Sequence, residues 1–434
     1  MKFYSTKNKA HTVDLKTAVL HSLPPDNGLY MPESIVPLDK YILDNIDEFT
    51  FQELSYNICH QFLSEDLSDK VIRNIISSSI TFDAPIVHLS EHLKSLELWH
   101  GPSLAFKDFG ARFMAALMSK LVEGEDRELN ILVATSGDTG GAVAAGFFMV
   151  PNINVTILYP SGKVSPLQEK QLTTLGGNIN AIEIEGTFDD CQSLVKKAFL
   201  DHDLNQSLNL SSANSINIAR LIPQSFYYFE AFKQIDKSLR NDILFCVPSG
   251  NFGNLTAGLI AKKMGLPFKK MIAATNINNV VPRYLESGVY SPVSSFTTIS
   301  NAMDVGNPSN FQRMLDLFDN SHQKMAEWIK PYFFDDIITR QSMLSVNKKY
   351  GYTADPHGAV GFQACEKYLK DHPASILINL ETAHPSKFLN VMKSVDIEVD
   401  IPERLKMLEN KKKNANLMTA DFSSFKSYLL SQSN

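Results

Sequence analysis

One lysine lies in an unusual setting in the stretch HGPSLAFKDFGARF, residues 100–113. Lys107 follows a Gly-Pro turn and is flanked by Phe106 and Phe109. Lysine is almost never fully buried unless it is paired or functional. Desolvation would lower the pKa of its amine and make the amine nucleophilic, as Schiff-base chemistry requires. The alternative is an ordinary solvated lysine.

The stretch VPSGNFGNLTAG, residues 247–258, concentrates small and polar residues where a strand turns into a helix. Glycines let the backbone approach a ligand closely, and the N–H groups of such a turn attract an anion. It matches neither the Walker pattern nor GxGxxG, which weakens the case for a nucleotide. The anion-binding candidates are Ser249, Gly250, Asn251, Gly253 and Asn254. The alternative is a tight turn with Asn as helix cap.

A second strand-turn-helix stretch, ATSGDTGGAVAAGF, spans residues 134–147. Its backbone N–H groups and hydroxyls could bind a carboxylate, although Asp138 could equally act as a helix cap. In LETAHPSKF, residues 380–388, Thr382 ends a strand. A phosphate-binding loop together with a desolvated lysine suggests pyridoxal 5′-phosphate (PLP), and the Thr382 hydroxyl would then keep its pyridine nitrogen neutral. The alternative is a threonine bonded to local backbone.

Short β-branched runs alternate with longer amphipathic stretches from about residue 96 onward. The expected strands are residues 130–135, 153–160, 178–186, 242–250, 271–276 and 375–382. Continuous apolar strands that alternate with helices predict an α/β fold with a mostly parallel sheet. Such sheets bind ligands at the carboxyl ends of their strands, which is where the loops above lie.

Composition excludes several classes of function. The net charge of -6 and a pI near 6.0 argue against a nucleic-acid partner. Four scattered cysteines form no zinc motif and no disulfide framework, so we expect no metal. No apolar run approaches the ~18 residues of a membrane span. The polar N-terminus lacks a secretory signal, which favours a cytoplasmic location.

Nine motifs together resemble the threonine synthase family, PLP enzymes of fold type II. In chain order they are NGLYMPE, HGPSLAFKDFGARF, ATSGDTGGA, YPSGKVSPLQEKQLTTLGGN, EGTFDDCQ, SANSINIARLIPQ, PSGNFGN, TADPHGAVG and ETAHP. The resemblance implies two lobes with mostly parallel sheets and a helical N-terminal domain. The expected divisions are 1–95 (N-terminal domain), 96–125 with 230–395 (large PLP lobe), 126–229 (smaller mobile lobe) and 396–434 (helical tail).

The resemblance also implies residue roles. Lys107 would carry PLP as a Schiff base, Ser249 to Asn254, with Phe252 among them, would bind its phosphate, and Thr382 would face its ring nitrogen. The loop Ser136, Gly137, Asp138 and Thr139 would hold the substrate carboxylate. Many fold type II enzymes have Asn in place of Asp138, and that Asn contacts the cofactor 3′-oxygen. Aspartate is usual in the branch that this chain resembles, and the resemblance leaves open whether Asp138 makes the same contact.

The implied substrate is O-phospho-L-homoserine, and the products are L-threonine and phosphate. Its phosphate needs a cationic site. The best candidates are the neutral donors Asn214, Ser215 and Asn217 with the guanidinium of Arg220, and behind them come Ser103 and Lys163. An isolated arginine such as Arg220 is more commonly a surface salt bridge. Lys107 would remove the Cα proton, phosphate would leave Cγ, and water would add at Cβ. The sequence leaves a monomer or a dimer open.

Three other functions compete with this interpretation. A serine/threonine dehydratase or an amino-phosphate phospholyase would keep PLP, but a dehydratase needs no phosphate site at Arg220. A non-catalytic sensor would not need Lys107. A nicotinamide-dependent oxidoreductase fits the alternating pattern but lacks GxGxxG.

Overall fold

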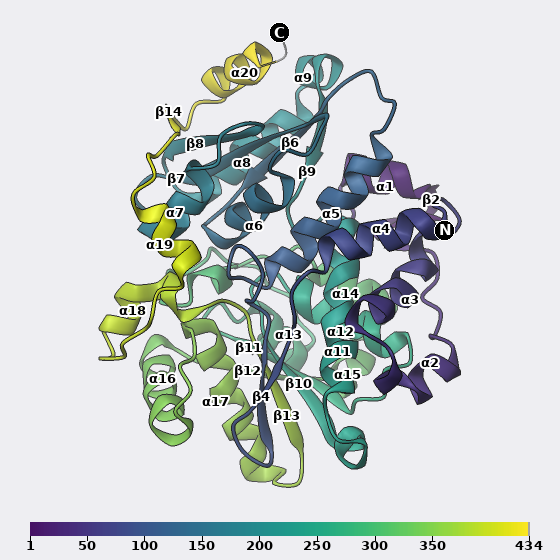
Figure 1. Cartoon of the computed structure of the whole chain (residues 1–434), viewed down its shortest axis with the longest axis vertical. Helices are drawn as coiled ribbons and strands as arrows, with labels where there is room; N and C mark the ends of the chain where they lie inside the picture. The colour runs from purple at the N-terminus through teal and green to yellow at the C-terminus, as the bar shows by residue number, and fades with distance from the viewer. Residues whose placement is uncertain (433–434) are drawn as a thin grey trace.

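The computed structural model describes residues 1–432, which form two α/β lobes and an N-terminal layer (Figure 1). One lobe is built on a six-stranded sheet and the other on a five-stranded sheet. Helix α5 (Lys107–Leu121) packs against α4 (Asp69–Ser79) of the N-terminal layer and α6 (Asp138–Phe147) of the second lobe. Within residues 1–432 no helix is long and apolar enough to cross a membrane.

The larger sheet has the strand order β12-β11-β10-β13-β5-β4, and only β4 runs antiparallel to its neighbour. Its strands are β4 (Ile86–His88), β5 (Leu93–Glu97), β10 (Ile243–Pro248), β11 (Lys270–Thr275), β12 (Ile329–Phe333) and β13 (Ile376–Glu381). Along β10, Phe245 and Val247 enter one hydrophobic cluster while Leu244 and Cys246 enter another. Both faces are therefore covered, which explains the continuous apolar run of this strand.

Helices cover the two faces of this sheet (Figure 1). They are α11 (Phe226–Lys233), α12 (Gly253–Lys263), α13 (Val280–Ser287), α14 (Phe311–Leu317), α15 (His322–Trp328), α16 (Asp336–Tyr350) and α17 (Pro356–Asp371). The face of β10 that holds Phe245 shares its cluster with residues of α11 and α12. The opposite face shares its cluster with residues of α16 and α17.

The second lobe has a fully parallel sheet of order β14-β8-β7-β6-β9. Its strands are β6 (Leu129–Ala134), β7 (Ile153–Pro160), β8 (Ile179–Glu185), β9 (Asn209–Ser212) and β14 (Asn416–Thr419). Its further helices are α7 (Pro166–Thr173), α8 (Phe188–Leu200), α9 (His202–Ser207) and α10 (Ile218–Leu221). Leu132 and Leu158 pack with α8 on one face, whereas Ile131 and Ile157 join the main core on the other.

The N-terminal layer contains the expected helices and also a three-stranded antiparallel sheet of order β2-β1-β3. Its elements are β1 (Phe3–Ser5), β2 (Asn8–Val13), α1 (Leu15–His21), β3 (Tyr30–Pro32), α2 (Lys40–Asp44) and α3 (Phe51–Leu63), followed by α4. A capping box between Thr50 and Glu53 fixes the start of α3.

The C-terminal segment runs from the larger lobe to the second lobe (Figure 1, yellow). It comprises α18 (Leu389–Lys393), α19 (Glu403–Glu409), β14 and α20 (Phe422–Ser431). Strand β14 pairs in parallel with β8, and Lys413 Nζ lies 2.6 Å from Glu183 Oε2. The tail is therefore not purely helical, because β14 extends the sheet of the second lobe.

The six strands predicted from sequence are confirmed as β6, β7, β8, β10, β11 and β13, each within two residues of the predicted bounds. The fold class, α/β with mostly parallel sheets, is also confirmed. The remaining strands were not predicted, because their sequences lack a long continuous run of apolar or β-branched residues. Strand β5, for example, reads LKSLE and is buried despite its lysine and serine.

Candidate active site

The three predicted loops follow the carboxyl ends of central strands. Residues 249–252 connect β10 to α12, residues 135–137 connect β6 to α6, and Thr382 follows β13. Since ligands of open parallel sheets bind beyond the carboxyl ends of the strands, this is the expected place for a site.

Lys107 is the first residue of α5, and the chain before it pairs with the chain after β13. Ala105 and Ala383 form an antiparallel bridge, and Phe106 N donates to Thr382 O at 2.9 Å. This pairing brings Lys107 and Thr382 together although they are far apart in sequence. Within residues 1–432 the Thr382 hydroxyl makes no hydrogen bond, so the alternative of a threonine bonded to local backbone is not observed.

The Lys107 side chain is mostly buried, with 16% of its surface exposed. Burial lowers the pKa of its amine to about 8, against an opposing contribution from Asp138. Its Nζ lies 5.9 Å from the centre of the Phe106 ring. Phe109, expected on the other flank, instead packs into the core against Phe82, with ring centres 4.7 Å apart.

Asp138 faces two lysines. Its Oδ2 lies 3.9 Å from Lys107 Nζ, and its Oδ1 lies 2.6 Å from Lys387 Nζ. Gln168 Nε2 donates to the same Oδ1 at 2.8 Å. Burial alone would raise the pKa of Asp138, but the charges of Lys387 and Lys107 hold it well below its ordinary value. The carboxylate is therefore ionised.

The backbone of this loop leaves several donors free. Gly137 has φ +138°, a conformation that L side chains rarely adopt, and a Cβ there would lie 2.7 Å from the Gln168 side chain. The Thr135 hydroxyl accepts from Gly137 N and Gly140 N. The N–H groups of Ser136, Asp138 and Thr139 have no acceptor among residues 1–432. They can receive a carboxylate.

The loop after β10 is held by its own side chains. Asn254 accepts from the Ser249 hydroxyl at 2.7 Å and donates to Pro248 O at 2.9 Å. Asn251 Nδ2 donates to Ser215 Oγ at 2.9 Å. At Gly250 a Cβ would lie 2.6 Å from Ala302 O, so the backbone can pass there only with glycine.

This arrangement leaves five consecutive backbone N–H groups, those of residues 250–254, without an acceptor in the described part of the chain. Free amides at a helix N-terminus form an anion site that no side chain needs to complete. Together with the Lys107 amine and the unpaired Thr382 hydroxyl, they fit a cofactor with a phosphate, an aldehyde and a ring nitrogen. The residues present thus fit PLP.

Arg220 is buried, with 3% of its surface exposed, and is not the surface salt bridge that its sequence favours. Its Nη1 donates to Ala213 O at 2.6 Å, and its Nε has no partner within residues 1–432. A Cβ at Gly110 would lie 2.8 Å from that Nε, which places the guanidinium against α5, one turn after Lys107. Burial lowers its pKa to about 10.

The other substrate-phosphate candidates divide into two groups. Asn214 Nδ2 donates to Ala134 O at 3.0 Å, so Asn214 lies at the end of β6, and Ser215 contacts the loop after β10. Ser103 is buried, and its Oγ has no partner among residues 1–432. Lys163 is exposed, and in the described chain no side-chain contact joins it to the others.

Lys387 is the principal residue that sequence analysis missed. It lies in a 3-10 helix (Pro385–Phe388), is fully buried, and donates to Ser103 O at 2.9 Å as well as pairing with Asp138. It follows Thr382 in a motif already noted, ETAHPSKF. Its burial, which distinguishes it from a surface lysine, is visible only in the fold.

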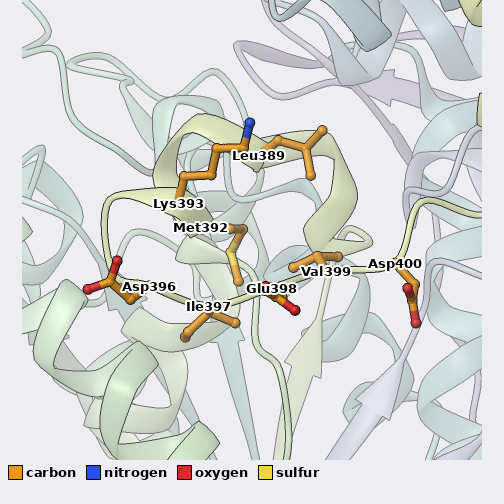
Figure 2. A pocket seen from close by; sticks show the side chains of 8 residues that line it. All are labelled: Leu389, Met392, Lys393, Asp396, Ile397, Glu398, Val399 and Asp400. Carbon is orange, nitrogen blue, oxygen red and sulfur yellow. The ribbon is translucent and has the colours of Figure 1, made fainter.

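A pocket of about 640 Å³ lies along α18 and the segment after it (Figure 2). Its lining residues are Leu389, Met392, Lys393, Asp396, Ile397, Glu398, Val399 and Asp400. None of the candidate site residues lines this pocket, so it is separate from the site around Lys107.

Three family models match the chain. A pyridoxal-phosphate dependent enzyme model matches residues 87–380, a threonine synthase N terminus model matches residues 2–80, and a threonine synthase C-terminal model matches residues 358–429. The first spans more than half of the chain. The matches cover both lobes and the N-terminal layer.

Curated relatives and solved structures agree with these models. The chain is 43% identical over 431 residues to threonine synthase of Haemophilus influenzae, covering 99% of this chain and 100% of that protein. The crystal structure of threonine synthase from Escherichia coli matches with a TM-score of 0.92 at 41% identity, over 100% of both chains. The structure of PLP-bound threonine synthase from Brucella melitensis matches with a TM-score of 0.93 at 32% identity, also over 100% of both chains.

Proposed function

Since this chain belongs to the threonine synthase family, we propose that its site converts O-phospho-L-homoserine and water into L-threonine and phosphate. The chain is a PLP-dependent lyase of threonine biosynthesis. The observation that carries the choice of substrate is the buried Arg220, whose free Nε lies against α5 beside the reactive lysine. A substrate without a phosphate would leave the Nε of this buried guanidinium without an acceptor, because among residues 1–432 only Nη1 is bonded, to Ala213 O.

The cofactor would be held at three points. Lys107 Nζ would bind its aldehyde, the N–H groups of residues 250–254 would bind its phosphate, and the Thr382 hydroxyl would face its ring nitrogen. Because a hydroxyl would not protonate that nitrogen as a carboxylate would, the ring nitrogen would stay largely neutral. When bound, PLP supplies an electron sink that stabilises negative charge on substrate carbons.

The substrate would be held at its two anionic ends. The free N–H groups of Ser136, Asp138 and Thr139 bind the α-carboxylate. Arg220 binds the phosphate with help from Asn214, Ser215 and Ser103, because charge-assisted hydrogen bonds from a guanidinium suit phosphate. Lys163 remains a further candidate, which could act only if its loop moves inward.

Lys107 is the group placed to move protons. With its pKa lowered to about 8, about a tenth of its amine is neutral at pH 7, far more than for an ordinary lysine, and a neutral amine can accept the Cα proton. In that step the Cα–H bond breaks, an N–H bond forms on Nζ, and the electron pair stays on the substrate. The protonated amine can then return its proton later in the cycle.

We also propose that the second lobe, residues 126–229, moves against the large lobe of residues 96–125 and 230–395 to exclude water. The N-terminal domain of residues 1–95 would flank these lobes. In the tail, expected at residues 396–434, strand β14 would move with the second lobe, because it pairs with β8. Closure would protect the site until water adds at Cβ. Crystals of the enzyme with and without a substrate analogue test this proposal, and identical lobe positions would refute it.

Four buried cysteines without disulfides are consistent with a reducing cytoplasm, which we propose as the location. The small-molecule substrate is the expected partner, and nothing in the charge distribution favours nucleic acid.

Borohydride reduction of the purified enzyme followed by peptide mapping tests the assignment of Lys107. The pyridoxyl group should be on Lys107 and should be absent in Lys107→Ala. Lys120→Ala, a change of a lysine on the same helix that pairs at the surface with Glu123, is the matched control. Release of phosphate and threonine in equal amounts from O-phospho-L-homoserine tests the reaction. Release of a 2-oxo acid instead would favour a lyase of another specificity.

A further inference from the structure

Lys387 and Asp138 form a buried ion pair between the two lobes. Lys387 follows β13 of the larger sheet, and Asp138 begins α6 after β6 of the smaller sheet. The Lys387 side chain is 0% exposed, its Nζ lies 2.6 Å from Asp138 Oδ1, and it also donates to Ser103 O. A buried charge requires a strong reason, because desolvating two ions costs several kcal/mol unless their geometry is good.

The pair is asymmetric with respect to Lys107. Asp138 directs Oδ1 to Lys387 and Gln168, and leaves only Oδ2 toward Lys107 at 3.9 Å. The closer lysine therefore takes most of the attraction of the carboxylate. An Asp138 without this partner would attract the Lys107 amine more strongly and keep it protonated.

We propose that Lys387 is a positioning residue that holds Asp138 in an ion pair and so lets the Lys107 amine lose its proton. The proposal rests on the proposed role of Lys107 as the base. The other charged groups near Lys107 act in known directions, since Asp138 raises its pKa while Lys387 and Arg220 lower it. Asp108, next in the chain, is bound by Ser103 N, and the loop of residues 249–254 carries no ionisable side chain.

The test measures the titration of Lys107 in the cofactor-free enzyme. Acetic anhydride labels only neutral amines, so acetylation of Lys107 across pH, measured by mass spectrometry, gives its pKa directly. In Lys387→Met we expect that pKa to rise by about 1 or more, because a like charge is lost and Asp138 is released. In Lys387→Arg, which keeps the charge, we expect a value close to that of the unchanged enzyme. An unchanged pKa in Lys387→Met would overturn the proposal.

The double variant Lys387→Met with Asp138→Asn removes both partners, so no unpaired buried charge remains if Lys387→Met alone does not fold. Its Lys107 pKa should be lower than in Lys387→Met, since the attracting carboxylate is gone. Equal values in the two variants would show that Asp138 does not mediate the effect, and would overturn the proposal.

If Lys387→Met alone does not fold, the comparator is Asp138→Asn: adding Lys387→Met to it should shift the Lys107 pKa by less than about 1, because the carboxylate through which Lys387 acts is already absent. A larger shift would overturn the proposal. Lys413→Met, which removes another lysine that bridges carboxylates, should leave Lys107 unchanged.

The loaded enzyme provides a second readout. Because the base must be neutral, the rise of kcat with pH should move to higher pH in Lys387→Met, and the enzyme should recover activity at alkaline pH. A loss of kcat that is equal at every pH would indicate a structural role instead. Failure of the proposed function is distinguishable, because borohydride mapping would then find no pyridoxyl group on Lys107, whatever the titration shows.

Discussion

The two strand-turn-helix loops of the site have the same backbone arrangement but differ in the charge of their side chains. Residues 249–252 and residues 135–137 both leave the carboxyl end of a central parallel strand and enter a helix. Both leave backbone N–H groups without an acceptor among residues 1–432. In the larger lobe, however, the loop is fixed by neutral side chains, with Asn254 bonded to Ser249 and Pro248. In the smaller lobe, Asp138 is charged and is held by Lys387 from the other lobe.

This difference separates binding from proton transfer. A loop with only neutral side chains can bind a phosphate, and the charge of the loop itself does not change with pH. A loop with a buried carboxylate between two lysines sets the protonation of the group that reacts. We therefore expect changes in the first loop to affect cofactor affinity and stability, and changes in the second to affect pH dependence.

The largest effect should come from Lys107→Ala. Its amine would bind the cofactor held by the first loop and remove a proton from the substrate held by the second. Loss of a general base alone costs about 10²–10⁴-fold in rate. We expect kcat to fall at least that far, measured as phosphate release under saturating substrate. If kcat stays within tenfold of that of the unchanged enzyme, Lys107 is not the base, and the two loops do not serve one reaction at this lysine.

Arg220→Met should follow in size. A hydrogen bond to a charged group contributes about 1.5–3 kcal/mol, which corresponds to about 10–100-fold in KM. Inorganic phosphate should also become a weaker inhibitor of the variant. Arg240→Met, which removes a guanidinium paired with Asp47 near the surface, is the control. Equal KM values in the two variants would remove Arg220 from the substrate site.

Gly250→Ala tests the rigid loop. Because a Cβ would lie 2.6 Å from Ala302 O, we expect a loss of about 1–3 kcal/mol in the free energy of unfolding of the cofactor-free protein. Gly253→Ala, where the nearest atom is 3.5 Å away, should cost less. Denaturant titration of both variants compares them, and equal losses would contradict the close approach at Gly250.

Asp138→Asn tests the charged loop. Removing the carboxylate removes the attraction that raises the pKa of Lys107, so that pKa should fall from about 8 by about 1. The rising limb of kcat should then move to lower pH. Asn254→Ala, the matching change in the neutral loop, should weaken PLP binding without moving that limb. If the rising limb of kcat moved in both variants, the two loops would not differ in their effect on proton transfer.

The smallest effect should come from Lys163→Ala. Lys163 is exposed and, among the described residues, makes no side-chain contact with the site. We expect kcat/KM to change by less than about twofold, as for most surface substitutions. A larger loss in kcat/KM would indicate that its loop reaches the substrate when the lobes close.

Local pattern was sufficient to predict much of the fold. Strand β10 reads ILFCVP, a continuous apolar run of the kind that identifies a buried parallel strand. Strand β7 reads INVTILYP, which is rich in β-branched residues and is buried at all but one position. Strand β14 escaped prediction because its four residues are largely exposed and pair only at a sheet edge. The N-terminal sheet escaped for a similar reason, since β2 reads NKAHTV and is mostly exposed.

The candidate site was predictable where its residues lie in one short stretch. Gly250 and Asn254 belong to one turn, and their types alone indicate close backbone approach. Lys387 and Gln168 could not be found this way, because each contacts Asp138, which is distant from both in sequence. Burial decides such roles, and it depends on how the lobes pack. The same reason explains why Arg220 is buried and why Phe109 points into the core.

Strand β14 has a consequence for biosynthesis. Its partner β8 is translated long before it, so β8 is an edge strand of the smaller sheet, opposite the edge at β9, while the ribosome makes the larger lobe. An open strand edge is a template for pairing with other chains. A nascent chain of this protein should therefore need shielding by chaperones until β14 emerges, and products of premature termination should aggregate through β8.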